Sequence, residues 1–372
     1  MTTVADIRQT MDTAFPPALA EEWDRVGLIC GDPSANVSRV AVALEATDAV
    51  VDHAIDRGAN MLIVHHPLLL KDTHSVATDD PKGRLLHRLI KNDCALFAAH
   101  TNADAAQGGV NDILADLLGV TETKPLKPIK ATLHKWGVMV PVDDAKKVKD
   151  AVFAVGAGKI GQYSHCSFEA EGTGQFLPED GSHPALGSVG KIEYATEVRV
   201  EFVARPNLDD DIIDAIARAH PYEEPAFDCV TMSGGVIGGI GRVGKLASPT
   251  TLKEFAQRVA DALPETVEGI RAAGDPDTRI ETVALCSGAG DSFLDQARAV
   301  GTDVYVTSDL RHHPADEHLR RGKPVLVDTA HWASEFPWCA SVATMMREQL
   351  GLPAEVIEVR TDPWTVHATK KR

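Results

Sequence analysis

The chain has 372 residues, of which 44% are hydrophobic and 24% charged, a composition typical of a globular protein with one or two domains. Its 37 basic and 54 acidic residues give a formal net charge of -17, which argues against nucleic acid or an anionic membrane as the main partner, because both would repel the chain. No signal peptide is evident, and no apolar run approaches the roughly 20 residues that span a bilayer. The six scattered cysteines show no Cys-x-x-Cys spacing, so we expect a reduced, cytoplasmic protein.

The first predicted elements form a strand, a helix and a second strand. They occupy residues 40–66, "VAVALEATDAVVDHAIDRGANMLIVHH". The apolar run from Met61 to Val64 is typical of a buried strand, and it is followed directly by His65 and His66, and by Pro67, which cannot donate a ladder hydrogen bond. The histidine pair is therefore predicted to lie at the C-terminal end of a strand. A third strand, "CALFAAHTN", ends at His100.

A similar pattern occurs later in the chain. Residues 283–309, "VALCSGAGDSFLDQARAVGTDVYVTSD", align with residues 40–66 without gaps, so that Asp48 falls on Asp291 and Gly58 on Gly301. The alternative explanation for this similarity is that any two strand-helix-strand units resemble one another. However, the third strand of the second copy, "KPVLVDTAHW", also has a histidine after it, His331. We therefore predict an α/β fold with two pseudo-repeated βαβ units and ligands at the strands' C-terminal ends.

The stretch between the copies has a different order of predicted elements. Residues 125–244 read as strand, helix, strand, strand, helix, strand, which is typical of a ferredoxin-like α+β domain. The glycines of "GGVIGGIGRVGK" are interpreted as a return linker. The sequence thus predicts a split α/β domain, residues 1–124 and 245–372, with an inserted domain at 125–244.

Five potential metal ligands gather at the predicted strand ends: His65, His66, Asp104, His331 and Glu335. The last two are four residues apart, which places them on one face of a helix. Three imidazoles and two carboxylates exceed one four-coordinate zinc site, but they suit two divalent ions, about 3.5–4 Å apart, that share a carboxylate or a water. Neighbouring residues of a strand point to opposite faces, so the two adjacent histidines can serve different ions. Zinc, iron and manganese all suit such ligands.

Each of these features also has a plain structural explanation. A His-Glu pair four residues apart is usually a solvated helix face, and an Asp in a loop is usually a turn or a cap. A histidine doublet is often incidental, as the second doublet, His312-His313, indicates. That doublet is predicted to open a helix with Pro314 in its first turn. The shared location at one end of one sheet favours the metal interpretation.

Longer motifs resemble the Nif-three-like family, whose bacterial members are also described as GTP cyclohydrolase 1 type 2 homologues and as dinuclear-metal hexamers. The motifs are "EEWDRVGLICGDP", "IVHHPLLLK", "HTNAD", "TSDLRHHPADE" and "DTAHWASE". The segments "GTGQFLPEDGSHPALG" and "HPYEEPAFDC" resemble an extra domain of longer bacterial members, related to PII-like and CutA-like trimers. The resemblance covers most of the chain.

The resemblance implies the same five metal ligands, held in a homohexamer that is a dimer of trimers or a trimer of dimers. His100 and Asp309 are expected to orient a ligand or a water, and His313 corresponds to a family histidine near the metals, which makes it a candidate acid/base group. The chain departs from the usual family residues at three positions: Glu45 stands where the family usually has Asp, and Ser308 and Ala330 stand where it usually has Gly.

Two functions follow as hypotheses. The first is a metal-dependent hydrolase acting on a small-molecule substrate such as a nucleotide, either by opening the guanine ring of GTP or by cleaving a phosphoester. The chain has no P-loop to support a nucleotide site. The second is a non-catalytic protein that binds metals or nucleotides or serves in assembly. For this role "HPYEEPAFDC" is interpreted as a trimer contact or a ligand loop, with a plain turn as the alternative.

Overall fold

The computed structural model describes residues 1–370 and divides into two compact units. One comprises Met1–Ile129 and the chain from Ile237 onward, and the other is Lys130–Val236. Both boundaries lie inside long strands, β5 (Val120–Pro141) and β8 (Phe227–Thr251), which continue from one unit into the other. The sequence analysis placed the domain boundaries between residues 124 and 125 and between residues 244 and 245. A strand that continues across a boundary shows no change of composition there, so the sequence does not mark the position.

The first sheet of the larger unit has the strand order β1-β4-β3-β2-β13. Its strands are β1 (Gly27–Cys30), β4 (Ala95–Ala98), β3 (Met61–Val64), β2 (Val40–Ala43) and β13 (Ala354–Val356). β13, β2, β3 and β4 run parallel, while β1 pairs antiparallel with β4. Because parallel strands end at the same edge, the residues after β3 and β4 are brought together.

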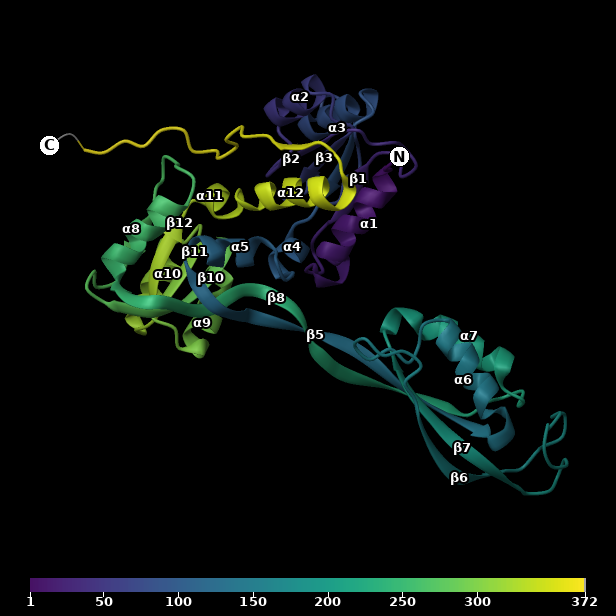
Figure 1. Cartoon of the computed structure of the whole chain (residues 1–372). Coiled ribbons are helices and arrows are strands. Elements are labelled where there is room, and N and C mark those ends of the chain that lie inside the picture. The colour runs from purple at the N-terminus through teal and green to yellow at the C-terminus, as the bar shows by residue number, and fades with distance from the viewer. Residues whose placement is uncertain (371–372) are drawn as a thin grey trace. The chain divides into compact units, whose positions relative to one another are not determined.

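Helices cover both faces of this sheet (Figure 1). One face packs against α2 (Asp48–Asp56) and α3 (Pro81–Lys91), and the other against α1 (Val4–Ala14) and α12 (Trp338–Leu350). Burial on both faces explains why β2, β3 and β4 are apolar at every position. Within residues 1–370, no helix is long and apolar enough to cross a membrane.

The second sheet has eight strands in the order β6-β7-β5-β8-β10-β11-β12-β9. In the larger unit it contains β8 together with β10 (Arg279–Ala289), β11 (Val304–Ser308), β12 (Val325–Thr329) and β9 (Arg271–Ala273). β10, β11 and β12 are parallel, whereas β8 and β9 are antiparallel to their neighbours. The associated helices are α8 (Leu252–Ala262), η4 (Asp291–Phe293), α9 (Leu294–Val300) and α10 (His312–Arg320).

The two sheets of the larger unit repeat one order of elements. The run β2-α2-β3-α3-β4 matches β10-α9-β11-α10-β12 in order and in parallel pairing, as the sequence repeat predicts. Short helices follow the strands or link the copies: η1 (Pro17–Leu19), α4 (Thr101–Ala105), α5 (Val110–Leu117) and α11 (His331–Glu335). α10 begins at His312 and has Pro314 in its first turn, so the predicted helix start is confirmed.

The smaller unit pairs one face of a sheet with two helices. Its elements are the end of β5, η2 (Val142–Asp144), α6 (Ala145–Ala154), β6 (Phe168–Phe176), β7 (Glu193–Ala204), η3 (Pro206–Leu208), α7 (Asp209–Ala219) and the start of β8. β7 pairs antiparallel with both β5 and β6. Its core is formed by apolar side chains of β5, β7, α6 and α7, including Trp136, Val148, Phe202 and Ile216.

The glycine-rich segment "GGVIGGIGRVGK" is not the linker predicted from the sequence. It belongs to β8, which runs without a break from Phe227 to Thr251. The glycines serve close packing: a Cβ at Gly239 or Gly241 would overlap the carbonyl oxygen of Lys127 or Leu285. Gly241 also has a φ of +66°, a conformation that glycine adopts without a steric penalty.

Candidate metal centre

The histidine pair lies where β3 ends. The backbone N–H groups of His65 and His66 both donate to the carbonyl of Leu44, at 3.1 and 2.9 Å, so the strand's regular ladder stops there. The two side chains then diverge: His65 is completely buried, whereas the His66 side chain is 24% exposed.

Asp104 reaches the same region from α4, the short helix that begins after β4. Its carboxylate lies 3.7 Å from Nε2 of His65 and accepts a hydrogen bond from the Ser287 hydroxyl at 3.3 Å. Its backbone carbonyl accepts from the Asn111 side chain at 3.0 Å. The carboxylate is therefore held by a helix, not by the open loop considered from sequence.

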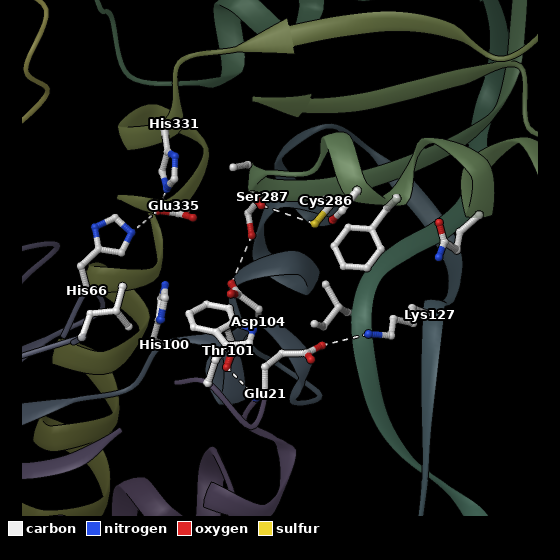
Figure 2. Close-up of a pocket in the computed structure, with 17 residues that line it drawn as sticks. Glu21, His66, His100, Thr101, Asp104, Lys127, Cys286, Ser287, His331 and Glu335 are labelled. Atoms are coloured by element: carbon white, nitrogen blue, oxygen red, sulfur yellow. Dashed lines mark hydrogen bonds and ion pairs between the residues drawn. The ribbon is translucent and has the colours of Figure 1, made fainter. Parts of the chain in front are cut away.

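The second copy contributes His331 and Glu335 from α11, which follows β12. They are the first and last residues of that helix, so the predicted spacing on one helical face is confirmed. Nε2 of His331 lies 3.2 Å from Oε2 of Glu335, and Nε2 of His66 lies 2.9 Å from the same oxygen. Figure 2 shows both imidazoles directed at this carboxylate.

Each histidine of the cluster is anchored through its Nδ1 atom. The partners are the Ala99 carbonyl for His65 (2.8 Å), Glu45 for His66 (3.0 Å), Asp24 for His100 (2.9 Å) and Asp309 for His331 (2.6 Å). All four partners are acceptors, so Nδ1 is the protonated nitrogen. In the neutral imidazole, Nε2 then carries a free lone pair, which is the arrangement found in carboxylate-histidine-metal triads.

The atoms that face the centre of the cluster lack hydrogen-bond partners. Nε2 of His65 and Oε2 of Glu335 are buried and make no hydrogen bond of acceptable geometry, although oxygen and nitrogen atoms lie 2.9–3.8 Å away. When the imidazoles are neutral, their Nε2 lone pairs and the carboxylate oxygens face one another, which costs free energy unless protons or a metal ion lie between them. The donor set thus fits a metal.

Two groups of three potential ligands share one carboxylate. One group is His65, Asp104 and Glu335, and the other is His66, His331 and Glu335, with the ligand atoms of each group within 4.8 Å of one another. A further group combines His65, His66 and His100. The carboxylate of Glu335 therefore belongs to both groups.

The charges of the cluster depend strongly on its burial. Burial lowers the pKa of His65 to about 3, against the opposing effect of Glu335, so this imidazole is neutral. For His66 and His331 burial also opposes the charged form, but the Glu335 carboxylate outweighs it and raises the pKa values to about 9 and 11. Burial, reinforced by the charge of Glu335, raises the pKa of Asp104 to about 7. The protein without metal thus retains protons that a bound cation would replace.

Gly288 gives Glu335 the space that it occupies. A Cβ on Gly288 would overlap Oε1 of Glu335 and lie 3.1 Å from Nε2 of His331, and its φ is +61°. Its N–H donates to the Ser334 hydroxyl at 3.0 Å. The position therefore requires glycine both for conformation and for the approach of α11 to β10.

A cavity of about 600 Å³ opens onto the cluster. Its walls include the five residues His66, His100, Asp104, His331 and Glu335, and, away from them, a second set formed by Glu21, Trp23, Lys127, Ile240 and Phe293. Nζ of Lys127 lies 3.0 Å from Glu21 and 5.6 Å from the centroid of the Phe293 ring. The cavity thus combines potential metal ligands, aromatic surface and one ammonium group (Figure 2).

The structure brings seven of the eight residues singled out from sequence to one place. Asp309 contacts His331, and the His100 ring lies 5.2 Å from that of His65. His313 is the exception: it is exposed on α10, its ring lies edge-to-face with that of His312, and it belongs neither to the cavity wall nor to the ligand groups formed by residues 1–370. Its acid/base role gains no support from this geometry.

Sequence reasoning missed two carboxylates that anchor the histidines. Asp24 accepts from His100 and from the backbone N–H of Thr101 at 3.0 Å. Burial acts to raise its pKa, but hydrogen bonds from His100 and Thr101 hold the pKa well below its usual range. Asp24 precedes His100 by 76 residues, so spacing gave no signal. Its place in the motif "EEWDRVGLICGDP" was the available hint. Glu45 was noted as a departure, not as a partner of His66.

Comparison with known families decides the assignment. The family model described as Duf34/NIF3 (NGG1p interacting factor 3) matches residues 2–363. The chain belongs to this family. The resemblance inferred from the sequence motifs is therefore confirmed.

Relatives and solved structures match over nearly the whole length. A protein of Mycobacterium tuberculosis (strain ATCC 25618 / H37Rv) named "GTP cyclohydrolase 1 type 2 homolog" is 50% identical, with 98% of this chain and 97% of the relative covered. A Bacillus subtilis (strain 168) protein of the same name is 39% identical, with 96% and 97% covered. The structure of a Bacillus cereus protein related to NIF3 has 35% identity and a TM-score of 0.74, and that of Staphylococcus aureus protein SA1388 has 28% identity and a TM-score of 0.82; each match covers 98% of this chain and 99% of the other. The Duf34/NIF3 chain is thus a mixed α/β protein with two sheets, similar to these structures.

Proposed function

We propose that the chain holds two divalent metal ions in the strand-end cluster and acts as a metal-dependent hydrolase. The observation that carries the proposal is that Glu335 belongs to two ligand groups, one completed by His65 and Asp104 and the other by His66 and His331. A carboxylate shared in this way is typical of two-metal sites with ions about 3.5–4 Å apart. Zinc, iron and manganese remain the candidate metals.

One ion would be held by His65, Asp104 and Glu335, and the other by His66, His331 and Glu335. When bound, such ions lower the pKa of a shared water and polarise a carbonyl or phosphoryl oxygen. The protein keeps each Nε2 lone pair free and directed toward the metal position. Glu45 and Asp309 do this for His66 and His331 by accepting their Nδ1–H groups. His100 lines the cavity with its Nδ1 anchored to Asp24, which places it to orient a water or to move a proton.

The rest of the cavity supports a substrate that has both a flat ring and negative charge. Trp23 and Phe293 offer aromatic surface, and Lys127 supplies an ammonium group beside Phe293. Nucleotides combine these two features. The curated relatives are named for GTP cyclohydrolase 1 type 2, so GTP is the first substrate to test, for ring opening with release of formate or for phosphoester hydrolysis.

The experiment uses the full-length protein after metal loading and metal analysis. We expect about two ions per chain, and release of formate from GTP, or of phosphate from a phosphoester, at a rate that falls to background in His65→Ala. Formate identifies ring opening, whereas phosphate without formate identifies a phosphoesterase. Retention of both ions with no turnover above the His65→Ala background would contradict the hydrolase proposal.

That last outcome would favour the second candidate function, a non-catalytic protein that binds metals or nucleotides. One observation supports this candidate: the predicted acid/base residue His313 is exposed and does not line the cavity. A nucleotide would then bind with an affinity that depends on metal, and would be released unchanged.

We further propose that residues 125–244 form an inserted ferredoxin-like domain and that the protein assembles into a homohexamer. The strand order β6-β7-β5-β8 and the order of helices and strands support the domain proposal. Large apolar side chains stand exposed on β6, β7 and β8, namely Phe168, Tyr194, Val230 and Val236, and contact between copies would cover such surface. Light scattering on the purified protein tests the assembly, and a monomer at micromolar concentration would overturn it.

A further inference from the structure

Two motifs that the proposed function leaves unused line one cavity in the smaller unit. The segment "GTGQFLPEDGSHPALG" (172–187) contributes Phe176, Leu177 and Pro184, and the segment "HPYEEPAFDC" (220–229) contributes Tyr222 and Ala226. The cavity has a volume of about 590 Å³, within the range of roughly 300–1,000 Å³ that holds a small organic ligand.

A carboxylate without a cationic partner forms part of the wall. Glu197, on β7, is 8% exposed. Within residues 1–370 it forms no ion pair, and its polar neighbour is the Tyr222 hydroxyl. The backbone of Gly174 on the adjacent strand gives it room, because a Cβ there would overlap Oε2 of Glu197. Burial of a carboxylate whose charge is offset by no neighbouring cation costs free energy.

A second polar atom of the same wall is also unsatisfied. The Tyr222 hydroxyl is buried and has no hydrogen-bond partner of acceptable geometry. Burial raises the pKa of Tyr222, and the hydrogen-bonding proximity and the charge of Glu197 raise it further, so the hydroxyl stays neutral. His220 fixes this segment: its Nδ1 accepts from the Tyr222 N–H at 3.1 Å and its Nε2 donates to the Met139 carbonyl at 2.9 Å. The hydroxyl and the carboxylate are thus held by a defined backbone.

The charge of the wall excludes one class of ligand. Among the described residues, no Lys, Arg or His lines the cavity, whereas Glu179, Glu223 and Glu224 join Glu197 there. Phosphate groups would meet negative charge with no cation to offset it. The cavity is therefore not a nucleotide site.

The wall also lacks the donors of a metal site. Zinc takes about four ligands and calcium about six to eight, but the buried part of this wall offers one carboxylate and one neutral hydroxyl. None of the ligand groups formed by the described residues includes Glu197. The uncompensated carboxylate calls for a cation that brings its own hydrogen-bond donors and an apolar body.

We propose that this cavity binds a small organic cation, an ammonium or guanidinium group carried on an apolar chain. The cationic N–H groups donate to Glu197 and to the Tyr222 oxygen. The chain packs against Phe176, Leu177 and Pro184. The charge-assisted hydrogen bond to the buried carboxylate provides the main specificity.

The test is calorimetric titration of the full-length protein with two cationic probes, hexylammonium and agmatine. Hexanol and hexanoate serve as neutral and anionic probes of matched length, and ATP tests the nucleotide alternative. We expect saturable binding of both cations and at least tenfold weaker binding of hexanol. Hexanoate and ATP should show no binding that depends on Glu197.

Two variants separate ligand binding from structure. Glu197→Gln keeps the size of the side chain and is expected to weaken cation binding at least tenfold. Glu171→Gln makes the same change at an exposed position of β6 and should leave binding unchanged. Tyr222→Phe is expected to weaken binding threefold to fivefold without lowering Tm, because removing an unsatisfied buried hydroxyl is not destabilising.

Three results would overturn the proposal. The first is the absence of saturable binding for both cations in a folded protein, and the second is equal binding of hexanoate. The third result combines two observations: the parent chain binds no probe, and Glu197→Gln changes the oligomeric state. It would mean that a second copy of the chain fills the cavity. Metal content measured in parallel keeps these outcomes separate from any failure of the metal centre.

Discussion

Glu335 and Glu197 are both buried glutamates, 3% and 8% exposed, yet their surroundings differ completely. Glu335 has Nε2 atoms of His66 and His331 at 2.9 and 3.2 Å. Glu197 has no nitrogen partner within the described part of the chain and lies among apolar groups and a Tyr222 hydroxyl. One carboxylate therefore sits among potential ligands, and the other sits alone.

The difference indicates which cation each site accepts. Around Glu335 the imidazoles of His66 and His331 keep their Nδ1 protons on Glu45 and Asp309, so each Nε2 offers a lone pair once its own proton has left. A cation there must accept lone pairs, which a metal ion does and an ammonium ion does not. Around Glu197 the other carboxylates of the wall are exposed, so a cation must satisfy the buried carboxylate with N–H donors of its own. The same residue type thus selects opposite kinds of cation.

The largest expected effect is loss of metal from Glu335→Gln. The amide cannot bridge two ions as a carboxylate does, so both sites lose a ligand and a negative charge. We expect the metal content to fall from about two ions per chain to less than half an ion, measured by elemental analysis after dialysis.

The contrast between the two sites requires that each glutamate act in its own site alone. Glu197→Gln should keep the full metal content, and Glu335→Gln should bind hexylammonium as the parent protein does. Loss of metal in Glu197→Gln, or retention of both ions in Glu335→Gln, would contradict the assignment.

A smaller but still large effect is expected from Gly288→Ala. The new Cβ would overlap Oε1 of Glu335 and would occupy a left-handed backbone, φ +61°. The conformational cost alone is roughly 1–2 kcal/mol. We expect displacement of α11 to add to it, with loss of metal, measured by urea unfolding and elemental analysis.

Gly301→Ala is the matched control. Gly301 also has a left-handed φ, +78°, but nothing lies within 4 Å of a Cβ there. It should lose about 1 kcal/mol and keep its metal. Equal behaviour of the two variants would mean that Gly288 serves conformation alone.

Much of the site was predictable because its residues follow strands. His65, His66 and His331 could be placed from apolar runs that end in polar residues, since parallel strands of one sheet end at one edge. Asp24 and Glu45 could not be placed in this way. Each lies far along the chain from the histidine that it contacts, and no periodicity links a side chain in a loop with a partner formed by tertiary packing.

The fold was predictable in the order of its elements, but the course of β8 was not. The repeat correctly indicated β10-α9-β11-α10-β12, because burial on both faces makes strands apolar throughout. The glycines of β8 were wrongly interpreted as a linker, because sequence alone does not distinguish a glycine that permits a turn from one that permits close packing. Glu197 carried no signal at all, since its burial depends on how two distant loops close over it.

Asp309→Asn is expected to weaken metal binding without removing a ligand. Asp309 accepts from Nδ1 of His331 and has a φ of +57°, which asparagine adopts readily. The amide oxygen still accepts the hydrogen bond, but the negative charge that makes the imidazole a better ligand is lost. Changes of this kind typically reduce metal affinity by about 10–100-fold. Competition with a chelator measures the effect, and Asp316→Asn, on the exposed surface of α10, should show none.

The smallest expected effect is a pH-dependent change in the free energy of unfolding. It concerns Asp303, a carboxylate outside both sites. Burial acts to raise the pKa of Asp303, but hydrogen bonds from Lys323 and from the backbone N–H groups of Thr282 and Glu281 outweigh it and lower the pKa to about 2. Because the folded-state pKa lies below the unfolded value, the stabilisation is present above about pH 4 and is lost as the pH falls toward 2.

Asp303→Asn should therefore destabilise the protein by about 1 kcal/mol at pH 7, the usual net worth of such a hydrogen-bonded charge, and by less at pH 3. Urea unfolding at both values measures the difference. Asp295→Asn, whose exposed carboxylate lies 3.6 Å from Arg321, should change stability by less than about 0.5 kcal/mol at either pH. A partly buried carboxylate that has its own donors thus behaves unlike Glu335 and Glu197, because it needs no added cation. A deficit that persists undiminished at pH 3 would show that its stabilisation does not come from charge.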